Sequence, residues 1–92
     1  VILIDADPAG RLMRWSRLAP LPPRLRVLAS GGERTIQDEV ARAAEDAAFV
    51  IIDLEGSASR LTSFAIAESD LVIVPTGDEQ QDADEAVETL AQ

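Results

Sequence analysis

The chain has 92 residues, with 17 acidic and eight basic side chains, a formal net charge of -9, no cysteine and 3% aromatic residues. This length fits one small domain, and the lack of cysteine excludes disulfides and thiolate metal sites. The aliphatic composition favours helices packed on a sheet over a β-sandwich. No apolar run approaches the roughly 20 residues of a membrane span and no signal peptide is recognisable, so we expect no membrane span and a cytoplasmic protein.

The charge is distributed unevenly along the chain. Residues 1–34 carry six arginines and three acids (+3), whereas residues 35–92 carry two arginines and fourteen acids (-12). A chain this acidic is poorly suited to bind nucleic acid by itself. The arginines at positions 11, 14, 17, 24 and 26 are either a basic patch that touches DNA or phosphate, or a solvated face.

The first third of the chain predicts strand, helix, loop and strand. Residues 1–4, VILI, are apolar without alternation, which is typical of a parallel strand covered on both faces. Residues 10–18 are compatible with a helix, on which Leu12, Trp15 and Leu18 could share a face. Three prolines in residues 20–23 end that helix, and residues 24–30 indicate a second strand.

The middle third predicts a helix followed by the clearest strand of the sequence. Thr35 is expected to cap this helix together with Asp38. Residues 48–55, AFVIIDLE, then indicate a strand that ends, like the first, in an acid. The buried stripe of the helix would consist of Ile36, Val40, Ala43, Ala44 and Ala47.

The last third predicts a helix, a strand and a final helix. Ser57 or Ser59 would cap the first helix, which ends near Glu68. Residues 70–76, DLVIVPT, indicate another buried strand, and residues 78–90 a helix capped by Asp78. The inward residues of the first helix would be Leu61, Phe64 and Ala65.

The predicted order is therefore βαβαβαβα within a single domain. Strands that alternate with helices and read as continuous apolar runs indicate an α/β fold. We expect a parallel sheet flanked by helices, with right-handed crossovers.

Three aspartates follow the buried strands. Asp5 and Asp7 come after the first strand and Asp53 after the third. Because parallel strands meet the ligand crevice at their carboxyl ends, these acids should lie at one edge of the sheet. A divalent cation, most simply Mg²⁺, would relieve their repulsion. The alternative is that the acids are solvated or cap the following helices.

Two long segments carry a family resemblance. VILIDADPAG, followed by Trp15, resembles the strand and loop that follow the P-loop helix in ParA/MinD-type ATPases, a family with plasmid-partition and conjugal-transfer members. The segment from FVIIDLEGSASR to IVPTGDEQQDADEA is similar to that family's Walker B strand, the next helix, and the strand that borders the nucleotide base. The resemblance implies a P-loop NTPase-like, three-layer αβα fold.

The resemblance also implies roles for individual residues. Asp7 would position or activate the attacking water, and Asp5 would help to hold the Mg²⁺ shell. Asp53 would be the Walker B acid that holds Mg²⁺ through water. Pro75 and Thr76 would lie near the adenine of ATP.

The sequence departs from the family pattern in three places. Ala9 stands where glutamine is common, and DLEGSAS replaces Asp-x-Pro-Pro, as in conjugation-type relatives. All eight basic residues are arginine, so the Gly-Lys-Thr loop that cradles phosphates is not in this sequence. We therefore expect residues 1–92 to be one partial ParA-like nucleotide-hydrolase domain that starts after the P-loop. Alone it should bind nucleotide poorly or not at all.

For the parent protein, the resemblance implies Mg-ATP hydrolysis coupled to plasmid or chromosome partition or to conjugal DNA transfer. It further implies an ATP-dependent homodimer, with DNA or a partition or relaxosome protein as partner. Two other interpretations stay open. One is a response-regulator receiver-like domain phosphorylated on Asp53, with Asp5, Asp7 and Thr76 in supporting parts. The other is a non-catalytic α/β homologue.

Overall fold

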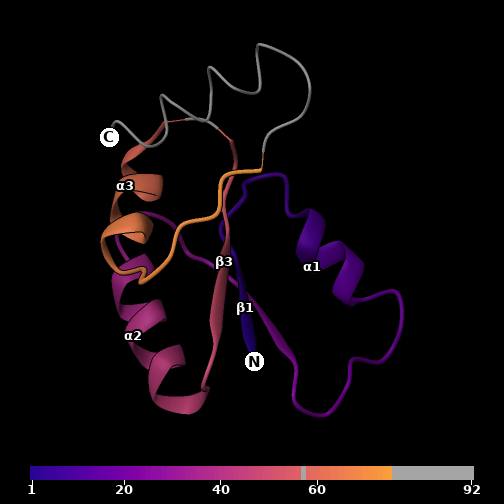
Figure 1. Ribbon diagram of the computed structural model, residues 1–92. Helices are drawn as coiled ribbons and strands as arrows, with labels where there is room; N and C mark the ends of the chain where they lie inside the picture. Colours follow the sequence, from indigo (N-terminus) through magenta and orange to yellow (C-terminus); the bar gives the residue numbers. More distant parts are fainter. Residues whose placement is uncertain (57, 76–92) are drawn as a thin grey trace.

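A computed structural model describes residues 1–56 and 58–75 of the chain. It contains a small parallel sheet with helices on its two faces (Figure 1). This confirms the predicted α/β class. The described elements are β1 (Ile2–Asp5), α1 (Arg11–Ser16), β2 (Arg26–Ala29), α2 (Ile36–Asp46), β3 (Val50–Asp53) and α3 (Arg60–Ala67).

The sheet has the strand order β2-β1-β3, and both pairings are parallel. The register places Leu3 of β1 beside Val27 of β2 and Ile51 of β3. At the carboxyl ends it places Asp5 beside Asp53. Two of the three predicted acids therefore stand on neighbouring strands at the same level.

Helices α2 and α3 lie on one face of the sheet, and α1 lies on the other (Figure 1). The core fills the space between the sheet and the α2–α3 face, because alternate β1 side chains point there. Helix α1 packs against β1 and β2. The fully or nearly buried core residues are Ile2, Ile4, Ala6, Ile36, Val40, Ala43 and Ala65.

Helix α1 forms as predicted but buries none of its residues. Trp15 is 51% exposed and Leu18 is 81% exposed, whereas Leu12 is half-buried. The three residues therefore share no buried face. The helix is six residues long and is followed by the proline-rich loop.

Helix α2 begins without the predicted cap. Thr35 makes no side-chain capping hydrogen bond. Its hydroxyl instead contacts Glu39, whose carboxylate also accepts a hydrogen bond from the hydroxyl of Ser30 (2.6 Å) and from the backbone N–H of Gly31 (2.8 Å). The pairing of Thr35 with Asp38 was wrong because Glu39, one residue further on, reaches back to the loop after β2. Of the predicted stripe, Ala44 is exposed.

Helix α3 follows its prediction closely. The hydroxyl of Ser59 accepts a hydrogen bond from the backbone N–H of Thr62 (3.1 Å), which makes Ser59 the cap. Ala65 is buried, and Leu61 and Phe64 are half-buried against the core. The sequence did not single out Thr62, which is 1% exposed.

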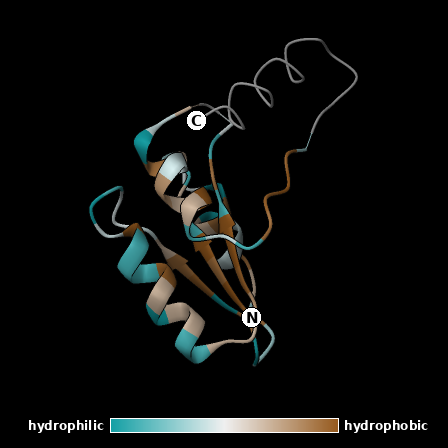
Figure 2. Ribbon diagram, turned by 60° about the vertical axis from the view of Figure 1, so that its left-hand side comes forward, coloured by the Kyte–Doolittle hydropathy of each residue, from teal (hydrophilic) through white to brown (hydrophobic). Residues whose placement is uncertain are grey.

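The strand predicted over residues 70–76 is wrong for its described part, because residues 71–75 form no strand. The stretch is apolar, as its brown colour in Figure 2 shows, yet Leu71 and Ile73 are largely exposed. Apolar character alone does not make a strand, which also needs a hydrogen-bonding neighbour. Thr76 and the predicted helix over residues 78–90 lie outside the described residues.

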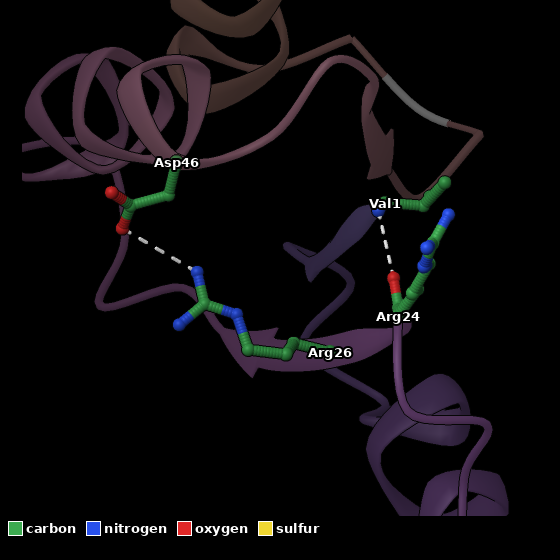
Figure 3. Close-up of polar contacts among 4 residues, drawn as sticks. All are labelled: Val1, Arg24, Arg26 and Asp46. Atoms are coloured by element: carbon green, nitrogen blue, oxygen red, sulfur yellow. Dashed lines mark hydrogen bonds and ion pairs between the residues drawn. The ribbon is translucent and has the colours of Figure 1, made fainter.

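Two polar contacts lie at the start of β2 (Figure 3). The nitrogen of Val1 donates a hydrogen bond to the carbonyl oxygen of Arg24 (2.8 Å), and Arg26 forms an exposed ion pair with Asp46 at the end of α2 (3.5 Å). Exposed pairs of this kind contribute little to stability. Within residues 1–56 and 58–75, no helix has the length and apolar character needed to cross a membrane.

Candidate functional site at the carboxyl edge of the sheet

The candidate site lies where β1 and β3 end side by side. The chain runs from β1 to β2 on one side of the sheet, while β3 lies on the other side of β1. This reversal is a topological switch point, and in open α/β sheets ligands bind just beyond the strand ends there. Asp5, Asp7 and Asp53 are all placed at this point, as the sequence predicted.

Asp5 is a buried carboxylate, 4% exposed, and both of its oxygens are engaged. Oδ1 accepts a hydrogen bond from the backbone N–H of Asp7 (3.1 Å), and Oδ2 accepts one from the backbone N–H of Met13 (2.9 Å). Met13 lies in the first turn of α1, whose preceding residue, Gly10, offers no side-chain cap. Asp5 therefore supplies the acceptor that the helix start lacks.

Asp7 forms the turn between β1 and α1. Its Oδ1 accepts a hydrogen bond from the backbone N–H of Ala9 (2.9 Å), and its carbonyl accepts one from Gly10 (2.9 Å). Gly10 has a φ of 66°, a left-handed conformation that favours glycine. Among the described residues, no hydrogen bond to Oδ2 of Asp7 is found. Asp7 is half-buried, so this second oxygen remains available for a ligand or a water.

The surroundings of Asp53 shift the pKa of its carboxyl group. Burial raises the pKa of Asp53 above its ordinary value, and the negative charges of Asp5 and Asp7 raise it further, while Arg11 lowers it in part. A carboxylate in this position is partly desolvated and is repelled by its acidic neighbours. A cation placed beside it would relieve both effects.

Two hollows meet at Asp53. The first, about 570 Å³, is mostly polar and contains Asp7, Arg11, Asp53 and Glu55. The second, about 590 Å³, is mostly apolar and runs between β3 and residues 71–75. Both share the segment from Asp53 to Gly56, so the acid stands between a polar and an apolar chamber.

The residues present fit a Mg²⁺ ion only in part. Within residues 1–56 and 58–75, no group of three or more acidic side chains is arranged to hold a metal ion. Asp5 is occupied by two backbone N–H groups, which leaves Asp53 and Asp7 as the acids that could face a hydrated ion. Mg²⁺ commonly takes one or two protein carboxylates and completes its shell with waters and phosphate oxygens.

Pro75 lines the apolar hollow together with Asp53, so the predicted base-binding residue and the predicted metal residue share one cavity. Their assignment to adenine and Mg²⁺ stays a prediction. Thr76 lies outside the described residues.

Sequence reasoning named Arg11 only as a member of a basic patch and did not single out Glu55, yet both residues line the polar hollow. Arg11 stands four residues after Asp7, at the start of α1, and Glu55 stands two residues after Asp53. Their positions in the sequence were a usable signal, because residues shortly after a strand-end acid line the same crevice as that acid. Among the described residues that line the hollow, Arg11 is the one cationic side chain, and it offers five donors for phosphate oxygens.

The chain is similar to one curated protein, "Protein ParA" of Rhizobium radiobacter, with 34% identity over 90 residues. The aligned part is 98% of this chain but 40% of that protein, so the chain spans two fifths of the length of the relative that it matches. The similarity supports a relationship to ParA proteins at the family level. No protein-family model matches the sequence, and no solved structure matches it.

Proposed function

We propose that residues 1–92 form the acid-bearing part of a ParA-like ATPase. The parent protein would bind Mg-ATP and hydrolyse it to drive plasmid or chromosome partition or conjugal DNA transfer. The observation that carries this proposal is the convergence of Asp5, Asp7 and Asp53 at the β1/β3 switch point. The similarity to a protein named ParA supports it.

The roles of the three acids follow from their surroundings. Asp53 has a raised pKa beside two further carboxylates, so it gains most from a hydrated Mg²⁺. Bound there, the ion would neutralise charge on the phosphate oxygens of the nucleotide. Asp5 would influence the ion without binding it directly, because both of its carboxylate oxygens already accept backbone hydrogen bonds. It fixes the turn that carries Asp7 and adds negative charge to the site.

Asp7 would orient and polarise the attacking water. One of its oxygens is held by the Ala9 N–H, which fixes the direction of the carboxylate. A positioned carboxylate within hydrogen-bond reach of a water can accept its proton as the water attacks phosphorus. Arg11, in the same hollow, would meet phosphate oxygens.

The phosphate cradle itself must come from outside this sequence, which has no lysine. We therefore expect residues 1–92 alone to bind Mg-ATP weakly, and the longer parent polypeptide to bind it with the help of a Gly-Lys-Thr loop. Isothermal calorimetry on both polypeptides tests this expectation. Micromolar affinity of the 92-residue chain would contradict it.

The metal role is tested by phosphate release from the parent polypeptide with Asp53→Ala. We expect turnover to fall by at least about 100-fold, the loss typical of a key electrostatic contact in catalysis. The matched control is Asp46→Ala, an exposed acid at the end of α2, which should leave turnover unchanged. Equal turnover in the two variants would contradict the proposal.

A second candidate is phosphorylation of Asp53, as in a receiver-like domain. The strand order β2-β1-β3, with acids at the β1/β3 switch point, favours it because flavodoxin-like folds share this arrangement. Acetyl phosphate with Mg²⁺ would then add one phosphoryl group to the chain, detectable by mass, and Asp53→Asn would abolish the addition. The ATPase proposal predicts no such product.

The ParA similarity also motivates proposals about assembly. The parent would form an ATP-dependent homodimer and engage DNA or a partition or relaxosome protein. Analytical ultracentrifugation of the parent with ADP and with a non-hydrolysable ATP analogue tests the dimer.

A further inference from the structure

The outer face of α1 is exposed and carries both charged and apolar side chains. Arg11, Arg14, Trp15 and Leu18 make up this face, because they follow one another at the helical spacing i, i+3, i+4 and i+7. The Leu18 N–H donates a hydrogen bond to the Trp15 carbonyl (3.1 Å), which continues the last turn of the helix. Trp15 is 51% exposed and Leu18 is 81% exposed. The half-buried residues of the helix are Leu12, Met13 and Ser16.

Positive charge is concentrated around this face. Residues 8–32 contain five arginines and no acid, whereas the rest of the chain contains 17 acids and three arginines. Within residues 1–56 and 58–75, Arg11, Arg14 and Arg17 form no ion pair. The guanidinium of Arg14 donates a hydrogen bond to the carbonyl of Ala9, which holds its charge beside the helix. The surface of α1 is therefore a basic area on a strongly acidic chain.

The apolar members of the outer face indicate that a helix covers it. Arginines alone would form an ordinary solvated face, but Trp15 and Leu18 expose large apolar surfaces beside them. Tryptophan and arginine are enriched among the residues that contribute most to binding a partner protein. The spacing i, i+3, i+4 and i+7 is that of a helix face packed on another helix. This face points away from the sheet, so further strands of the same sheet would leave it uncovered (Figure 1).

The charge and the apolar area together select the chemistry of that helix. Carboxylates complement the arginines, and aliphatic side chains complement Trp15 and Leu18. A nucleic acid fits less well, because Leu18 offers nothing to a phosphate and the net charge of -9 repels a polyanion at longer range. A helix with a few acids beside an apolar stripe satisfies both halves of the surface.

We propose that the outer face of α1 binds an acidic amphipathic helix of a partner protein. Aliphatic side chains of the partner pack on Trp15 and Leu18, and its carboxylates pair with Arg14 and Arg17. The proposal goes beyond the ATPase function and does not depend on it, because no residue of the β1/β3 acid cluster takes part.

The fluorescence of Trp15 provides a direct test, because the chain has one tryptophan and no tyrosine. The probe is a capped peptide of about 15 residues, long enough to form some helix in water, with leucines at i, i+3, i+4 and i+7 and glutamates beside them. Its matched control carries glutamine in place of every glutamate. We expect the acidic peptide to shift the Trp15 emission to the blue and to bind at least about tenfold more tightly than its control. Raising the salt to about 0.5 M should weaken binding, because exposed charges are screened.

Two substitutions locate the bound peptide on the chain. Arg17→Glu should weaken binding at least about tenfold, because it places like charges opposite each other. Arg42→Glu reverses an exposed arginine on α2, across the sheet, and should leave the affinity unchanged. Leu18→Ala should also weaken binding while keeping all charges. Circular dichroism checks that each variant is folded. Equal affinity of Arg17→Glu and Arg42→Glu, or of the acidic and the glutamine peptide, would overturn the proposal.

Four further outcomes would assign the face to another occupant and would each overturn the proposal. A DNA duplex that shifts the Trp15 emission at a lower concentration than the peptide would assign it to nucleic acid. A blue shift that grows with the concentration of the chain alone would assign it to a second copy. A red shift of the unliganded chain on addition of salt would assign it to the chain's own acids. Loss of peptide binding in the parent polypeptide would assign it to another segment of the parent. No nucleotide takes part in these readouts, so their failure is distinguishable from a failure of the ATPase proposal.

Discussion

The two edges of the sheet differ in how they meet solvent. At the β2 edge, Arg26 is exposed and pairs with Asp46, and Leu28 is 43% exposed. At the β3 edge, Ile51 is exposed and faces another exposed apolar stretch across a groove. Charged side chains are a common means of blunting a terminal strand, whereas a long apolar edge invites pairing. The difference teaches that, among the described strands, β2 carries a charged edge suited to a terminal position, while β3 is suited to an interior position.

The largest expected contrast in the free energy of unfolding is between alanine replacements of a buried isoleucine in α2 and of an exposed isoleucine in the stretch 71–75. Ile36→Ala removes a side chain that is 0% exposed, and should lower the free energy of unfolding by about 2–5 kcal/mol. Ile73→Ala, on the open side, should change it by less than about 0.5 kcal/mol. Urea unfolding followed by circular dichroism measures both. Equal losses would contradict the comparison between the two edges, because they would mean that the stretch 71–75 is packed as tightly as α2.

Asp5→Ala tests the structural role of the carboxyl edge. Two backbone N–H groups lose their acceptor, so we expect a loss of about 1–3 kcal/mol in the free energy of unfolding. Asp70→Ala, at an exposed acid, is the control and should have an effect within about 0.5 kcal/mol. Hydrogen exchange at the Met13 amide should rise in the first variant alone. An unchanged Met13 amide would show that Asp5 does not hold the start of α1.

Removing a cap sharpens the comparison between the two helices on the core face. Ser59→Ala deletes the acceptor for the Thr62 N–H and should destabilise the chain by about 1 kcal/mol. Thr35→Ala removes no capping hydrogen bond and should cost less. Thermal unfolding of the two variants checks the order. A larger loss for Thr35→Ala would contradict the capping scheme.

The smallest expected effect is a gain in stability, on replacement of Asp53 by asparagine. The pKa of Asp53 is raised in the folded chain, so the folded state holds this proton more tightly than the unfolded state does. The contribution of Asp53 to stability is therefore greatest at acidic pH. It falls as the pH rises from the ordinary value of 3.8 through the raised folded pKa. Asp53→Asn should flatten this fall and raise the melting temperature at pH 7. A steeper fall in the variant would contradict the cause assigned to the shift.

The sequence predicted the strands and the parallel order because runs such as VILI and FVII have no polar alternation. It also predicted that Asp5, Asp7 and Asp53 meet at one edge, which follows from parallel topology alone. It failed at residues 70–76, because a strand depends on a neighbour that local sequence does not reveal. The capping of the following helix, which the sequence left open as an alternative for these acids, occurs at Asp5. A strand-end acid looks the same whether it binds a ligand or a helix N–H, although Gly10, as a weak cap, was a usable signal.

The most direct test of the central claim, that this edge carries out phosphate chemistry, is Asp7→Ala in the parent polypeptide. Nucleotide binding and phosphate release are measured on the same preparation, with Asp46→Ala as the control. The account predicts that the Asp7→Ala variant still binds Mg-ATP while phosphate release is lost, because only the orientation of the attacking water is removed. Phosphate release at the control rate would contradict the account.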